Sequence, residues 1–187
     1  MNNQFTGWLG EKATAWGLSQ GLDPKIYWRI DDVIIPNGKG GTAQLDHVIV
    51  SQFGIFVVET KNRHGVILGK PDDQRWQQIN ESKIYEFQNP LAQNESHIQA
   101  LVQLTQLPRW AFHSIIYFCG EARFRHPMPF NVRTEGVTTV VRSKNQILLW
   151  PDELNYAWDT LCAWKRNGNR LRERHVRYVQ SFQNHAL

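Results

Sequence analysis

The chain has 187 residues, of which 41% are hydrophobic, and it includes eight Trp and nine Phe. This length and composition predict a single domain with a substantial core, and no run approaches the ~18–20 apolar residues of a membrane span. The first residues lack the charged and apolar regions of a signal peptide, so we expect a cytoplasmic protein. The net charge of +4 and the isoelectric point near 9.2 favour polyanionic partners only mildly. Cys119 and Cys162 lie outside any CxxC pattern, which indicates free thiols and neither a disulfide nor a zinc site.

The N-terminal region predicts a helix over 4–20, with glutamate 11 at the edge of its apolar stripe. Such a glutamate is typical of a solvated helix face, but Glu11 is also placed to look into a site if the helix packs on a sheet. A strand is predicted over 26–35, followed by a glycine-rich turn over 37–41. The predicted apolar stripe of the helix consists of Phe5, Trp8, Leu9, Ala13 and Trp16.

The central stretch, residues 44–61, reads QLDHVIVSQFGIFVVETK. Two apolar runs, 45–50 and 55–58, flank a polar connection, and this pattern predicts a β-hairpin. The runs are rich in β-branched and aromatic residues, which favour strands. Both faces of each run are largely apolar, so we expect these strands to be central and covered on both sides.

The register of this hairpin decides where its charged residues point. A connection of two or four residues places Asp46 opposite Glu59, and Gln44 opposite Lys61, with all four side chains on one face. A three-residue connection closing on Gly54 would move Glu59 to the other face. We adopt the even register because it clusters the charges.

Two close, buried carboxylates repel each other unless a positive charge lies between them. A divalent cation meets that requirement, and hard oxygen ligands favour Mg²⁺ or Mn²⁺. The alternative is a structural ion pair of Lys61 with Glu59 or Asp46, and the spacing alone leaves both open. In the even register His47 faces away from Asp46, so we expect a hydrogen-bonded core histidine and not a ligand.

Downstream, a turn over 62–65 precedes short strands predicted over 66–68, 75–79 and 82–87. Asn89 and Pro90 form a helix start, and the helix is predicted to run to about 106. Gln93 and His97 share one face of it; Gln93 either contributes to a site or faces water. The remaining predictions are a strand over 114–119, a loop over 121–133, a strand over 136–141, a helix from 151 to near 168 and a last helix over 170–182.

The C-terminal region is rich in basic residues. A basic helix of this kind can track phosphates, or it can be a solvated face, and the pattern does not decide between them. The six basic residues are Lys165, Arg166, Arg170, Arg172, Arg174 and Arg177.

Several motifs together carry a family resemblance. Asp46, followed thirteen positions later by Glu59-Thr60-Lys61, resembles the D…ExK core of the PD-(D/E)xK nuclease superfamily. The neighbouring blocks closely resemble the NERD (nuclease-related) domain over about residues 7–120. These blocks are Gly10-Glu11, QLDHVIVS at 44–51, GIFVVETKN at 54–62, Gly65, Trp76 and NPLAQN at 89–94. We therefore expect one domain over 1–187, with a NERD-like core at about 7–120 and a helical basic extension at about 150–187.

The resemblance implies an α/β, restriction-endonuclease-like fold, in which a mixed central sheet is flanked by helices. It implies metal-dependent hydrolysis of DNA, with Asp46, Glu59, Glu11 and the main-chain carbonyl of Thr60 around Mg²⁺ or Mn²⁺. Lys61 would act on the nucleophilic water or the transition state, and Gln44 and Gln93 would position water or phosphate. The sequence leaves open whether RNA is also a substrate, and whether the chain forms a homo-oligomer or binds a partner protein. The alternative functions are a nucleic-acid-binding module without turnover and a scaffold that acts only with a partner. The extension would bind nucleic acid through Lys165, Arg166, Arg170, Arg174 and Arg177.

Overall fold

The computed structural model describes residues 3–81 and 83–183, and within these it does not describe the side chains of 3–6, 169, 170, 179 and 181–183. The elements in chain order are α1 (Asn3–Gly21), β1 (Trp28–Pro36), β2 (Thr42–Ser51), β3 (Gly54–Lys61), β4 (Gly65–Leu68), β5 (Arg75–Asn80), β6 (Lys83–Gln88), α2 (Pro90–Thr105), the 3₁₀ turn η1 (Arg109–Ala111), β7 (Phe112–Phe118), β8 (Ala122–Phe124), β9 (Val132–Arg133), α3 (Val137–Arg142), α4 (Pro151–Arg166) and α5 (Gly168–Gln183).

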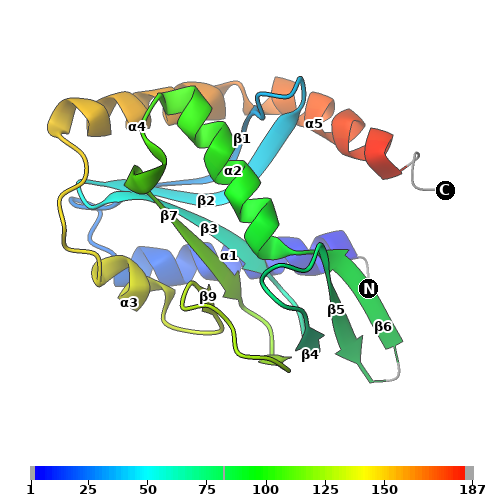
Figure 1. Cartoon of the computed structure of the whole chain (residues 1–187). Coiled ribbons are helices and arrows are strands. Elements are labelled where there is room, and N and C mark those ends of the chain that lie inside the picture. The colour runs from blue at the N-terminus through cyan, green and yellow to red at the C-terminus, as the bar shows by residue number, and fades with distance from the viewer. Residues whose placement is uncertain (1–2, 82, 184–187) are drawn as a thin grey trace.

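The strands form two mixed sheets. The central sheet has the order β1-β2-β3-β7-β9, with β1, β2 and β3 antiparallel and β7 parallel to β3. A smaller sheet, β6-β5-β4-β8, stands beside it, and its β5–β6 hairpin projects from the molecule (Figure 1). Helices α2 and α4 cover one face of the central sheet, and α1 and α3 cover the other (Figure 1). The expected α/β fold with a mixed sheet flanked by helices is confirmed.

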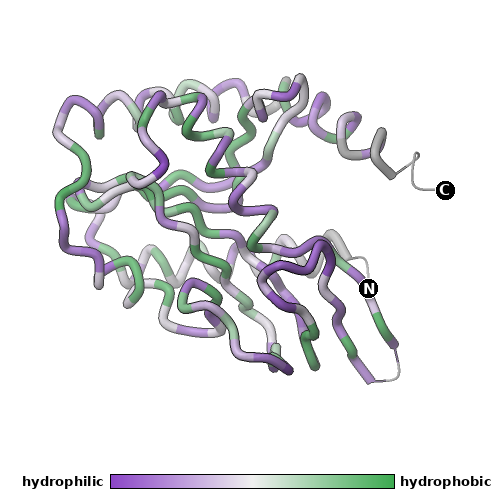
Figure 2. The backbone as a smooth tube through the Cα atoms, in the orientation of Figure 1, coloured by the Kyte–Doolittle hydropathy of each residue, from purple (hydrophilic) through white to green (hydrophobic). Residues whose placement is uncertain are grey.

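The apolar runs of β2 and β3 lie in the hydrophobic centre of the fold (Figure 2), and their side chains fill both layers of the core, as their composition predicts. Val48, Val50 and Val57 pack with α2 and α4, whereas Ile49 and Phe56 pack with α1 and α3. A third cluster, around the fully buried Trp76, joins the smaller sheet to β7.

The buried face of α1 differs from the predicted one. Trp8, Leu9 and Trp16 are 51%, 46% and 69% exposed, so the predicted apolar stripe is wrong. The helix instead buries Gly10, Thr14 and Leu18, three residues spaced four apart. A Cβ at position 10 would lie 2.7 Å from Cys119 Sγ and 2.8 Å from Asn62 Cβ, so glycine lets the helix backbone approach the sheet. The close approach of the α1 backbone to the sheet, and not the hydrophobicity of the side chains, determines which face of α1 packs.

Two predictions after residue 120 are also wrong. Residues 121–133, expected as a loop, contain the short strands β8 and β9. Residues 136–141, expected as a strand, fall largely within the helix α3. Gly136 begins it in a left-handed conformation, with φ of 68°, and Val137, Val140 and Val141 become buried at helical spacing. The valines pack against Leu18 of α1 and its neighbours, and this burial outweighs their β preference.

Candidate active site

The β2–β3 hairpin has the even register. Ser51 pairs with Gly54 across a two-residue connection, and the ladder continues to His47 opposite Val58. Continuing this register places Asp46 opposite Glu59. His47 lies on the face covered by α1 and is 1% exposed, with its Nδ1 2.8 Å from Asp31 Oδ1. It is therefore a buried, hydrogen-bonded histidine, as expected.

The regular main-chain pairing of β2 with β3 stops before Asp46. The next hydrogen bond between the two strands involves a side chain, because the Thr60 amide donates to Asp46 Oδ2 at 2.8 Å. On the other side of β2, the register of β1 places Asp32 opposite Asp46, but this pair is absent from the ladder, and Asp32 has a left-handed φ of 51°. The strands therefore lose main-chain pairing around Asp46, and its carboxylate is fixed against the Glu59–Thr60 peptide.

Glu59 is the most deeply buried acid of this region, with 3% of its side chain exposed. Its Oε1 lies 2.6 Å from Lys61 Nζ, and its Oε2 lies 3.3 Å from His97 Nδ1. Burial alone would raise its pKa, but the Lys61 charge and the His97 ring outweigh burial and lower the pKa of Glu59 to about 2. Oε2 makes no hydrogen bond within the described residues, so one buried oxygen of this carboxylate has the His97 ring as a neighbour but lacks a hydrogen-bond donor.

Asp46 has the opposite behaviour. Burial is the largest cause that raises its pKa well above the ordinary value, and the negative charges of Glu59 and Glu11 raise it further. The Thr60 hydrogen bond and the Lys61 charge only partly offset these effects. The pKa of Asp46 and the pKa of Glu59 are thus shifted in opposite directions, although the two carboxyl groups are neighbours.

Helix α2 supplies two more groups to this site. Asn89 caps its first turn by accepting the Leu91 amide, and Pro90 begins the helix, so the sequence fixes where α2 starts. Gln93, on the first turn, accepts a hydrogen bond of 3.0 Å from Lys61 Nζ through its Oε1. The Lys61 ammonium therefore lies between the Glu59 carboxylate and the Gln93 amide.

Glu11 reaches the site from the opposite layer. It is partly buried on α1, and its pKa is raised, first by burial and then by the charge of Asp32; Glu59 also raises it, while His47 and Lys61 lower it. Its link to Asp46 and Glu59 is electrostatic, and the structure gives it no direct bond to either. The close packing of Gly10 beside it sets how near Glu11 comes to the sheet.

Gln44 is tied to a residue that sequence reasoning missed. Its Nε2 donates a hydrogen bond of 2.8 Å to Asp32 Oδ1. The predicted pairing of Gln44 with Lys61 lies beyond the last ladder pair, His47 with Val58. Asp32 Oδ2 forms an ion pair with Arg172 of α5. The sequence signal for Asp32 is a pair of aspartates inside an apolar strand, and the signal for His97 is its position one helical turn after Gln93.

These residues fit a hard divalent cation better than a zinc ion. Over residues 3–81 and 83–183, no group of three or more His, Cys, Asp and Glu side chains is arranged to hold a metal. Mg²⁺ is commonly held by one or two carboxylates and completed by water. Asp46 and Glu59, two carboxylates that repel each other, are donors of that kind.

The basic residues at the C-terminus fall into two groups. Lys165 donates to the main-chain oxygens of Asp31 and Asp32, both at 2.7 Å, and Arg172 pairs with Asp32, so these two anchor α4 and α5 to β1. The other basic residues make weaker contacts: Arg166 is exposed, Arg174 reaches the Gly40 oxygen at 3.3 Å, Arg177 reaches the Glu173 oxygen of its own helix at 3.4 Å, and the side chain of Arg170 lies outside the described residues.

Comparison with known proteins places this site in a family. Residues 6–119 match the model of the nuclease-related domain, NERD. The chain is 32% identical over 186 residues to the uncharacterized protein pXO1-01 of Bacillus anthracis, covering 95% of this chain and 85% of that one. No solved structure matches the chain. Within the described residues, no helix is long and apolar enough to cross a membrane. The family model covers more than half of the chain and includes Glu11, Asp46, Glu59 and Lys61, so the protein belongs to the NERD, or nuclease-related domain, family.

Proposed function

We propose that the chain is a metal-dependent nuclease that hydrolyses phosphodiester bonds of DNA in the cytoplasm. The observation that carries this proposal is the meeting of Asp46, Glu59 and Lys61 where β2 and β3 lose their pairing. Two repelling carboxylates beside one ammonium group form a site that can bind a cation and still present a positive charge to an anionic substrate.

Hydrolysis of a phosphodiester is slow because the anionic phosphate repels hydroxide, so the site has to supply positive charge. A bound Mg²⁺ or Mn²⁺ supplies that charge and lowers the pKa of a coordinated water. Asp46 and Glu59 would hold the ion, the Thr60 carbonyl would add a ligand, and Glu11 would act directly or through water.

Lys61 acts on the reacting groups. Gln93 holds its ammonium group beside Glu59 at hydrogen-bonding distance. From this position it orients the attacking water or stabilises the pentavalent transition state as a point charge. Gln93 positions Lys61, and Gln44, held by Asp32, faces the same region as a donor for water or phosphate.

One observation favours a second candidate. The Lys61–Glu59 pair at 2.6 Å already neutralises the buried Glu59 without a metal, as it would in a nucleic-acid-binding module that has the scaffold but no turnover. In that case nucleic-acid binding would not depend on Mg²⁺, and no cleavage would be found.

A nuclease assay on the purified chain separates these functions. Single-stranded DNA, duplex DNA and RNA are incubated with Mg²⁺, Mn²⁺ or EDTA, and the Lys61→Met protein serves as a matched control for contaminating nuclease. We expect cleavage of DNA with Mg²⁺ or Mn²⁺ that stops in EDTA and falls by on the order of 10²–10³ in the variant. Cleavage by Lys61→Met at the wild-type rate would contradict the proposal, and binding without cleavage under every condition would support the module.

A further inference from the structure

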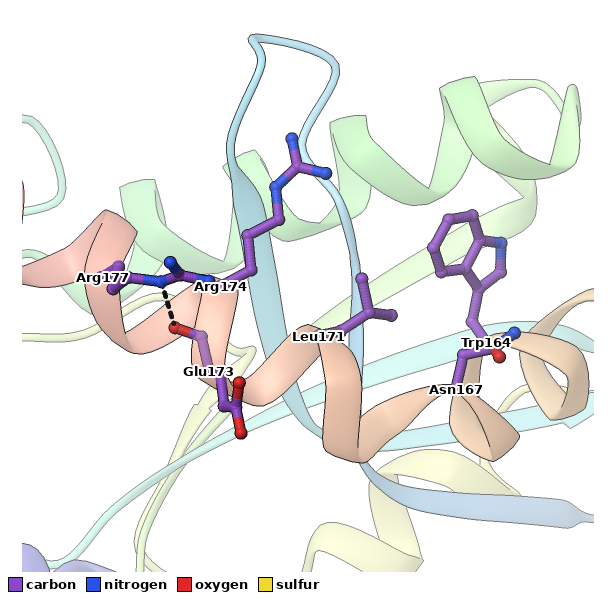
Figure 3. Close-up of a pocket in the computed structure, with 6 residues that line it drawn as sticks. All are labelled: Trp164, Asn167, Leu171, Glu173, Arg174 and Arg177. Carbon is purple, nitrogen blue, oxygen red and sulfur yellow. Dashed lines mark hydrogen bonds between the residues drawn. The ribbon is translucent and has the colours of Figure 1, made fainter.

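An open cavity of about 570 Å³ lies where α4 meets α5, and Glu11, Asp46 and Glu59 are not among its lining residues. We propose that it binds one nucleotide of a single-stranded nucleic acid, with the base against Trp164 and the adjoining phosphates on Arg174 and Arg177. The inference rests on the proposed nuclease function and narrows its substrate. The cavity is lined by Trp164, Asn167, Leu171, Glu173, Arg174 and Arg177 (Figure 3).

Trp164 provides the aromatic surface. Its side chain is partly buried and packs against the core cluster beneath α2 and α4, so the core fixes the indole while it also lines the cavity. Leu171 stands next to it in the cavity wall (Figure 3). A fixed aromatic ring in an open cavity is a stacking surface that accepts any base, because every base has a π-face.

Arg174 and Arg177 provide the charge. They are one helical turn apart on α5, so their side chains are neighbours. Arg174 uses one nitrogen for the Gly40 oxygen, and Arg177 uses its Nε for its own helix. Since a guanidinium group has five N–H donors, both residues keep donors for a phosphate. Lys165 and Arg172 differ, because each is bound to β1.

Glu173 is the one carboxylate in the cavity wall. Figure 3 shows its carboxylate directed to the opposite side of α5 from the Arg174 guanidinium. The side of the cavity that Trp164, Leu171 and Arg174 share is therefore positive and aromatic. This combination fits a nucleotide better than it fits a simple anion or an apolar ligand.

The geometry favours a single strand over a duplex. In a duplex each base is paired and stacked on its neighbours, so its face is not available to Trp164, whereas an unpaired base is free to stack. The volume lies within the roughly 300–1,000 Å³ of typical ligand cavities. Arg172, about 7.5 Å before Arg177 along the axis of α5, pairs with Asp32 beside the acidic site. A strand held by Arg174 and Arg177 would thus lie along the helix that leads to that site.

Binding in EDTA tests the proposal without cleavage. Fluorescence anisotropy compares a labelled single strand, the matching duplex and a free deoxynucleotide monophosphate. Trp164→Leu is expected to weaken single-strand binding about 5- to 100-fold, the range for losing one base–aromatic stack, and to leave duplex binding unchanged. Trp164→Phe should bind nearly as wild type, and Trp150→Leu, which changes a 72% exposed tryptophan at the start of α4, should have no effect.

The charged groups are tested separately, so that a folding defect at Trp164 does not decide the outcome. Arg174→Gln with Arg177→Gln should lower the salt slope of single-strand binding by about 0.7 for each lost phosphate contact. Arg142→Gln, an exposed arginine in the last turn of α3 and outside the cavity, is the matched control.

Three results would overturn the inference. The first is unchanged single-strand binding in folded Trp164→Leu and in the double arginine variant. The second is a loss of duplex binding as large as the loss of single-strand binding, and the third is binding of the free nucleotide as tight as that of the single strand. If Mg²⁺-dependent cleavage persists in any of these cases, the proposed function stands and only the cavity assignment fails. If the wild-type chain neither binds nor cuts any nucleic acid, both fail.

Discussion

Lys61 and Glu59 stand two residues apart on β3, and their charged atoms meet at 2.6 Å in a region where Glu59 is almost fully buried. The pair neutralises one of two neighbouring carboxylates, whereas burial and the charge of Glu59 raise the pKa of the other, Asp46. These opposite shifts of the two pKa values lead to the following predictions.

Lys61→Met is expected to lower the cleavage rate by on the order of 10²–10³ while DNA and metal binding persist. The substitution removes one electrostatic donor but keeps an apolar stem of similar length. Single-turnover cleavage and anisotropy measure the two properties separately. If the lysine is instead only a structural counter-ion, the variant should lose roughly 3–5 kcal/mol of stability, and Mg²⁺ should not raise the melting temperature even of the wild type.

Asp46→Asn should raise the melting temperature of the metal-free protein and abolish the increase that Mg²⁺ causes. Asparagine keeps an oxygen that can accept the Thr60 amide and removes the charge that repels Glu59. Thermal melts with EDTA and with Mg²⁺ measure both effects. A variant that Mg²⁺ still stabilises as strongly as the wild type would exclude Asp46 as a ligand.

Stability should depend on pH in opposite ways with and without metal. The Asp46 pKa is raised in the folded protein, so its contribution to metal-free stability is fully present below the unfolded pKa and is lost as pH rises through the folded pKa. Glu59, with its pKa lowered to about 2, gives stability that is present above its unfolded pKa and is lost only as pH falls towards 2.

Above pH 5 Glu59 stays ionised, but the pKa of Glu11 is also raised, so the comparison of wild type with Asp46→Asn is what isolates the contribution of Asp46. Without metal the melting temperature of the wild type should fall as pH rises, and the Asp46→Asn protein should lack this component. With Mg²⁺, the increase in melting temperature should grow with pH, since the ligand has to lose its proton. An increase independent of pH would show that the ion does not bind at Asp46.

Gly10→Ala is expected to lower the free energy of unfolding by about 1–3 kcal/mol and to reduce cleavage. The added methyl would lie 2.7 Å from Cys119 Sγ and push α1, with Glu11, away from the sheet. Gly17→Ala is the control in the same helix, because its methyl meets nothing within 4 Å and alanine favours a helix by about 1 kcal/mol. Chemical denaturation measures both, and equal effects would contradict the packing explanation.

Only part of the basic extension is expected to contribute to the salt dependence of DNA binding. Neutralising Arg170, Arg174 and Arg177 together should weaken DNA binding and flatten its salt dependence by up to about one unit per lost phosphate contact. Lys165→Gln should instead act mainly on stability, because Lys165 binds the main-chain oxygens of β1. An unchanged slope in the triple variant would make the helix a solvated face.

The sequence predicted the hairpin and its register because both depend on local patterning. Alternation along two apolar runs and a short connection leave few registers, and only the even ones gather the charges. The start of α2 was predicted for a similar reason, since Asn89 and Pro90 act within one turn. The sequence left open whether Gln93 enters a site or faces water; the structure places its Oε1 3.0 Å from Lys61 Nζ, and its role stays a prediction.

Other features depend on partners distant in sequence and were missed. Asp32 reaches the site only because β1 pairs with β2 and because α5 supplies Arg172 from 140 residues away. The packing of α1 depends on Asn62 and Cys119 lying against Gly10. The valines of α3 form a helix because Leu18 and its neighbours offer them a surface to cover. No window of local sequence contains this information.

The hydrophobic core extends further along the chain than the segment that matches the family model. The family match ends at residue 119, yet Leu149, Ala157 and Leu161 share one buried cluster with Val48, Val57 and Leu101. A fragment trimmed to the match would expose that cluster to water and strip Asp32 of Arg172 and Lys165. Experiments on the proposed chemistry therefore need the chain through α5, because the last third of the chain completes the core beneath the central sheet and supplies the ion-pair partners of Asp32.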